Sequence, residues 1–205
     1  RISHGAVVAL SFSMSVMTVI TMVIFGILSI VGQDIAQAKE EASYQRHIAK
    51  YFKISLLISA VVLLLAFSFA LLIYDHVGLL AAKFILVYAF GFIPFIFSTA
   101  FRYVLLAKSH DRIIKLTNVI TFVVCVVMTL VCYYFFRHLS IVSFAFGCII
   151  AFIYNLLHLT YFSLRKNIIS FSFLKYVKTI AWVECLRFIY AGCQVSLVYA
   201  SDSIV

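Results

Sequence analysis

Long apolar segments constrain the fold of this chain more than any other feature. Six of them, each longer than 20 residues, carry very few charges: 5–32, 54–74, 79–101, 113–136, 139–164 and 176–201. A helix needs about 20 apolar residues to cross the hydrocarbon core of a bilayer. None of the segments alternates polar with apolar residues as a membrane β-barrel strand does. The sequence therefore predicts an all-α polytopic membrane protein with six transmembrane helices.

Composition excludes several other classes of protein. The chain is 65% hydrophobic and 11% charged, whereas soluble domains are about 45–50% apolar and about 25% charged. No nucleotide-binding, zinc or nucleophile motif occurs, so we expect no enzyme activity and no cofactor. The five cysteines lie inside apolar segments without CxxC spacing. Such cysteines are typical of small buried apolar side chains, so no metal site is predicted.

The basic residues indicate an orientation in the membrane. Twelve of the 16 Lys and Arg residues flank the first, third and fifth connections: Lys39, Arg46, Lys50, Lys53, Arg102, Lys108, Arg112, Lys115, Arg165, Lys166, Lys175 and Lys178. Because basic loops stay cytoplasmic, both chain ends are predicted to lie outside. This topology accounts for the net charge of +9, so we expect membrane lipid as a partner and no nucleic acid. An external Arg1 in place of a methionine indicates a preceding helix or a cleaved signal peptide.

Three short stretches carry a resemblance to a known family. Residues 32–38 read GQDIAQA, and a charged amphipathic stretch, 39–53, follows them. Residues 91–94 read GFIP, and 101–107 read FRYVLLA. Together they resemble the turn after the second helix, the kinked fourth helix and its exit in the multidrug and toxic compound extrusion (MATE) family of efflux transporters.

The resemblance implies helices two to seven of a twelve-helix transporter. Residues 1–170 would be an incomplete N-terminal lobe of five helices, 171–205 would start the C-terminal lobe, and the second lobe of the same parent chain would be a partner. The expected function is secondary active efflux of organic, cationic compounds in exchange for H⁺ or Na⁺, in a bacterial inner membrane. The chain departs from the family at 126–133, which lacks the Asn-Asp pair of many bacterial members, and at 180–182, which replaces a GLP motif.

Polar residues inside the apolar segments are the candidate binding residues. Glu184 and Arg187 lie three apart, so they can pair on one helix face, and a regular helix from Lys178 would carry them well into the membrane. They form either a cation or proton site or a self-neutralised structural pair. Tyr190 and Gln194 share that helix and are weaker candidates for the same site.

Two further features each have two interpretations. Asn155 and His158 could line an aromatic cavity for lipophilic cations, or they could bond to neighbouring helices. Pro94, preceded by Gly91, removes a backbone hydrogen bond in mid-span and is predicted to kink its helix as a hinge.

Two alternative functions stay open. A lipid-linked oligosaccharide flippase of the same superfamily would need several Arg or Lys residues around its cavity, and Arg187 is the one basic residue predicted deep in the membrane. A degenerate membrane fragment that does not transport would explain the missing Asn-Asp pair.

Overall fold

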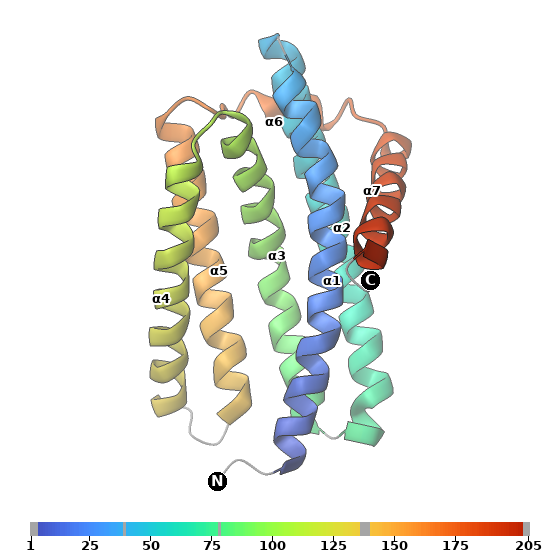
Figure 1. Cartoon of the computed structure of the whole chain (residues 1–205), viewed down its shortest axis with the longest axis vertical. Coiled ribbons are helices and arrows are strands. Elements are labelled where there is room, and N and C mark those ends of the chain that lie inside the picture. The colour runs from blue at the N-terminus through green and yellow to red at the C-terminus, as the bar shows by residue number, and fades with distance from the viewer. Residues whose placement is uncertain (1–3, 39, 78, 136–139, 203–205) are drawn as a thin grey trace.

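The computed structural model describes residues 4–38, 40–77, 79–135 and 140–202. Within these ranges the regular structure is helical: α1 (His4–Gln37), α2 (Glu41–Val77), α3 (Leu79–Ala107), α4 (Asp111–Phe135), α5 (Ser140–Arg165), the short α6 (Phe173–Val177) and α7 (Trp182–Asp202). The five long helices α1 to α5 stand side by side in one bundle (Figure 1).

Five helices of the described part are long and apolar enough to cross a membrane. These stretches are Ser11–Gln37, Glu41–Leu72, Ala81–Ala107, Asp111–Phe135 and Val142–Arg165. They correspond to the first five predicted segments, and the helical class is confirmed. Large apolar side chains also cover the outer surface, as lipid-facing helices require; Phe122 and Leu130 of α4 are examples.

The sixth predicted segment, 176–201, is not one helix. The chain leaves α6 at Val177, and α7 begins only at Trp182. The backbone N–H and the side-chain hydroxyl of Thr179 both donate to the carbonyl oxygen of Tyr176. This local bonding competes with a helical ladder and accompanies the break. The predicted division at residue 170 stays a prediction.

The second predicted segment begins too late. The sequence predicts a start at Ile54, but α2 already starts at Glu41 and contains residues 41–53 of the amphipathic stretch predicted as a connection. At about 1.5 Å per residue, 37 residues exceed a hydrocarbon core of about 30 Å. The polar N-terminal turns of α2 therefore extend the helix rather than separate two helices.

Helix α3 lies at the centre of the bundle. It packs against α1 and α2 on one side and against α5 on the other, while α4 packs mainly on α5 and α7 mainly on α1. Small residues allow close contacts between these helices. Gly147 of α5 faces the backbone of Thr129 in α4, and Gly192 of α7 faces the backbone of Ile27 in α1.

One end of the bundle holds the basic connections. The end of α1, the start of α2, the α3–α4 connection and the segment 166–181 all lie there (Figure 1). We call this the basic end. Ser109 and Asn167 have positive φ angles of 59° and 53° just beyond α3 and α5. Each allows the chain to leave its helix sharply, and Asn adopts this left-handed conformation readily.

Candidate functional site

An apolar groove lies near the basic end. Its volume is about 520 Å³. Residues of α2, α3, α5, α6 and the segment before α6 line it: Phe52, Phe97, Phe101, Leu156, Leu157, Thr160, Ser163, Leu164, Ile169, Phe171, Phe173 and Leu174. Leu157 and Phe171 are more than 60% exposed, so the groove opens at the side of the bundle. We refer to it below as the side groove.

Aromatic rings form the wall of the side groove toward α2 and α3. Phe97 and Phe101 are four residues apart and so lie on the same face of α3. The ring of Phe52 lies 5.2 Å from that of Phe97 and 5.6 Å from that of Phe173, measured between centroids. These distances are in the range of favourable aromatic pairs. The three helices α2, α3 and α6 are therefore joined by contacting rings, tilted relative to one another, at the groove.

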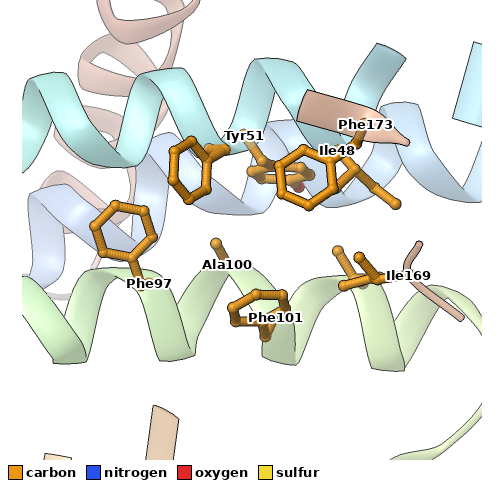
Figure 2. A pocket seen from close by; sticks show the side chains of 9 residues that line it. Ile48, Tyr51, Phe97, Ala100, Phe101, Ile169 and Phe173 are labelled. Atoms are coloured by element: carbon orange, nitrogen blue, oxygen red, sulfur yellow. The ribbon is translucent and has the colours of Figure 1, made fainter. Parts of the chain in front are cut away.

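A smaller cavity of about 20 Å³ continues from these rings between α2 and α3. Figure 2 shows Phe97, Ala100 and Phe101 on α3 opposite Ile48 and Tyr51 on α2. The Tyr51 hydroxyl donates to the carbonyl oxygen of Leu28 in α1, 3.1 Å away. This bond satisfies the polar end of a buried ring and leaves the cavity lining apolar.

The end of α5 shapes the other wall of the side groove. The N–H of Ile168 donates to the carbonyl oxygen of Ser163 at 2.9 Å, and the N–H of Asn167 donates to that of Leu164 at 3.0 Å. With Asn167 in the left-handed region, these bonds form a Schellman motif. The motif turns the chain back, so that Ile169 and Phe171 reach the groove.

Hydroxyl groups are the polar feature of the lining. Thr160 and Ser163, three residues apart on α5, both line the side groove. Ser163 is fully buried, and its hydroxyl has no hydrogen-bond partner within the described structure. A buried polar group without a partner is costly to the folded state.

A row of cations on α2 contacts the start of α7. The Arg46 guanidinium lies 3.9 Å from the Glu184 carboxylate. One turn further, the Lys50 ammonium lies 3.2 Å from the centroid of the Phe188 ring. The Lys53 ammonium lies 4.2 Å from the Trp182 ring, in the next turn of α2. The two cation–π contacts therefore join α7 to α2, beside the long Arg46–Glu184 pair.

Glu184 does not have the predicted environment. It lies in the first turn of α7 at the basic end, and its side chain is 44% exposed. Within the described residues its ion-pair partner is Arg46 rather than Arg187. The predicted depth assumed one helix from Lys178, whereas α7 begins at Trp182.

The other predicted binding residues fall into two separate groups. Arg187, Tyr190 and Gln194 are exposed on α7. Asn155 and His158 lie on α5, which packs against α3 and α4, while α7 packs against α1 and α2. In Figure 1, α5 and α7 lie on opposite sides of α3. The structure therefore does not bring the six predicted residues together.

His158 bonds to a neighbouring helix, as one of its two interpretations predicts. Its Nδ1 lies 2.9 Å from the hydroxyl oxygen of Thr117 in α4. The Tyr154 ring stacks on the imidazole at 5.7 Å. Asn155, one turn before, is 3% exposed, and its Oδ1 has no hydrogen-bond partner in the described structure.

The predicted hinge residues lie within an unbroken helix. α3 continues through Pro94, which has no N–H to donate. A Cβ on Gly91 would lie 3.1 Å from the Cγ1 of Ile149 in α5. Gly91 therefore has a packing role against α5, and a hinge at Pro94 stays a prediction.

A further cavity lies where α1 ends and α2 begins. Its volume is about 420 Å³, and polar side chains dominate its lining, among them Asp34, Glu40 and Ser43. The His47 Nδ1 lies 3.9 Å from the Asp34 carboxylate there. Within the described residues no three His, Cys, Asp or Glu side chains are grouped as metal ligands.

Sequence reasoning missed the side groove. The spacing of Phe97 and Phe101 was a usable signal because it places two rings on one helix face. Comparison with protein-family models, curated proteins and solved structures finds no match to this chain. The resemblance to MATE transporters therefore rests on the short stretches of sequence described above.

Proposed function

We propose that this chain is part of a secondary transporter that exports organic compounds, cationic or amphipathic, in exchange for H⁺ or Na⁺. The observation that carries the proposal is the side groove, with a volume of about 520 Å³ and an almost entirely apolar lining. Ligand sites for small organic molecules are typically clefts of about 300–1,000 Å³ with a few polar groups. A groove open at the side of a membrane bundle suits compounds that enter from the lipid.

The aromatic lining supports a substrate with an apolar body. Phe52, Phe97, Phe101, Phe171 and Phe173 all contribute rings to the groove. The ring faces attract organic cations, and the groove excludes water from their apolar parts. Transport itself would require alternating access between this bundle and a second lobe of the parent chain, in a bacterial plasma membrane.

Glu184 is the proposed carboxylate for the coupling ion. Its side chain is partly exposed and lies beside Arg46, so it is within reach of water and of a competing cation. Arg187 lies one turn further along α7, with Tyr190 and Gln194 beyond it. In this proposal a cation that binds Glu184 would loosen its contact with Arg46.

Binding of a fluorescent lipophilic cation to the reconstituted chain tests the proposal. We expect Phe97→Ala and Phe101→Ala to weaken binding of rhodamine 6G by roughly three- to tenfold, since each removes a cation–π partner. Phe122→Ala on the outer face of α4 is the matched control, because Phe122 is 70% exposed. Fluorescence anisotropy at increasing protein concentration measures the affinity. Equal binding by all four proteins would refute a substrate site in the groove.

A transport assay tests the two-lobe part separately. Vesicles that contain only residues 1–205 should not extrude the dye, because a central site requires both lobes. Efflux by these vesicles would instead indicate a carrier made of several copies of this bundle.

A further inference from the structure

Basic residues adjoin the lining residues of the side groove in the sequence. Arg165 and Lys166 directly follow Leu164, and Lys175 directly follows Leu174; both leucines line the groove. All three basic side chains are exposed. The sequence contains no Asp or Glu between Asp111 and Glu184, so α5 and α6 bring no acid to this place.

The remaining charges of the described structure do not neutralise this rim. Its ion pairs join Arg46 with Glu184, His47 with Asp34, and Lys115 with Asp111. None of them includes a basic residue of the rim. We call Arg165, Lys166 and Lys175 the basic rim of the groove. An apolar groove with a cationic rim is complementary to a molecule with a hydrocarbon body and an anionic head.

We propose that the side groove binds an anionic phospholipid of the surrounding membrane. One acyl chain lies against Phe97, Phe101 and Phe173, and the phosphate lies at the basic rim. Burial of the chain supplies the affinity, and the rim supplies the selectivity for negative headgroups.

The position of the groove along the bundle suits this ligand. The segment that carries the rim lies at the basic end (Figure 1). If the five apolar stretches cross the membrane as predicted, the Lys and Arg residues of this end are level with the lipid phosphates. The orientation predicted from the basic loops puts this end in the cytoplasmic leaflet, which is the leaflet rich in anionic lipid.

The lipid site does not depend on transport. A bundle that transports nothing would bind the same lipid by the same contacts. In a transporter, the lipid would occupy the groove until a substrate displaces it. The basic rim attracts an anionic lipid and repels an organic cation, so the two ligands respond in opposite directions to a change of the rim.

A tryptophan inside the groove provides a site-specific test. Trp182 is the one tryptophan of the chain. Trp182→Phe combined with Phe97→Trp leaves a single reporter in the groove, and Trp182→Phe combined with Phe122→Trp leaves a control reporter on the outer face of α4. Each is reconstituted in phosphatidylcholine vesicles that contain a small fraction of brominated lipid, which quenches tryptophan fluorescence on contact.

We expect brominated phosphatidylglycerol to quench the groove reporter more than brominated phosphatidylcholine does, and the control reporter equally with both lipids. Lys166→Gln and Lys175→Gln should each lower this preference by about fivefold, the amount for one basic residue near a lipid surface.

Two results would overturn the proposal. Equal quenching of the groove reporter by both lipids would show that the groove does not select an anionic headgroup. An equal phosphatidylglycerol preference at the control reporter would show a general surface attraction rather than a site. Rhodamine binding measured on the same Lys→Gln variants separates this proposal from the proposed function, since loss of the rim should not weaken binding of a cation.

Discussion

The ammonium nitrogen of Lys53 lies 2.5 Å from the carbonyl oxygen of Ile180 and thereby ties α2 to the non-helical link between α6 and α7. It also lies 3.4 Å from the carbonyl oxygen of Val177. Lys53 is 8% exposed. Carbonyl groups at a helix break lack helical partners, and a buried lysine beside them supplies three donors. The helix break thus leaves carbonyl groups that need donors, and the buried Lys53 ammonium supplies them.

Lys53→Met should detach the start of α7 from the bundle. The substitution keeps an unbranched side chain but leaves the carbonyl groups of Val177 and Ile180 without their donor, at a cost of about 1–3 kcal/mol. The Lys53 ammonium lies over the Trp182 ring. Its loss should expose the ring further, so acrylamide should quench the fluorescence of Trp182 more strongly. Lys115→Met is the control, since Lys115 forms an exposed pair with Asp111 far along the sequence. Unchanged quenching in Lys53→Met would contradict this role.

Apolar length was sufficient to predict most helices of this fold. A helix must satisfy its own backbone in lipid, so long uncharged segments have few alternatives. The link at 178–181 could not be predicted this way, because the donor for its carbonyl groups comes from Lys53 more than a hundred residues earlier. The predicted start of α2 was too late because charged residues on an amphipathic stretch are typical of a connection. The helix continues through these residues.

The side groove was beyond sequence reasoning for a similar reason. Its lining combines α2, α3, α5 and α6. Each contribution is an ordinary apolar residue in its own segment, and only packing brings Phe52 and Phe173 together. Glu184 stood out in the sequence because a charge in an apolar segment is rare. Its depth depended on where α7 starts, which the segment itself does not reveal.

Gly147→Ala should destabilise the contact of α4 with α5. A Cβ at this position would lie 2.9 Å from the Cα of Thr129, closer than side-chain carbons approach a backbone, and the backbone cannot move aside alone. Overpacking of this kind costs about 1–3 kcal/mol. Thermal unfolding in detergent, followed by circular dichroism, should show a lower midpoint. Gly91→Ala is the matched comparison because its Cβ would lie 3.1 Å from the Cγ1 of Ile149, a looser contact with a side chain rather than a backbone, and equal midpoints for both variants would refute the distinction.

Thr117 and His158 should be coupled energetically. Their hydrogen bond joins α4 to α5 inside the apolar bundle, and such bonds between membrane helices contribute about 0.6 kcal/mol on average. A double-mutant cycle of Thr117→Val and His158→Phe, read from reversible unfolding in micelles, should give a coupling energy of that size. Thr121, which bonds within its own helix to Thr117, provides the comparison: Thr121→Val and His158→Phe should be additive. Additivity in the first cycle would mean that the bond contributes nothing.

Glu184→Gln should have little effect on stability and a selective effect on transport. Its pair with Arg46 is long, at 3.9 Å, and both side chains are substantially exposed. Exposed pairs contribute about 0–1 kcal/mol because water and salt screen them.

For the same reason Arg187→Leu should be tolerated, since Glu184 keeps Arg46 and is not left as an unpaired buried acid. Membrane abundance and unfolding midpoint of the two variants therefore should match those of the unchanged protein. If Glu184 is the coupling carboxylate, Glu184→Gln in the parent chain abolishes exchange-driven efflux at normal abundance, whereas Glu41→Gln, in the first turn of the α2 helix that carries Arg46, leaves it intact. A large loss of abundance in Glu184→Gln would instead show that the pair holds α7 in place.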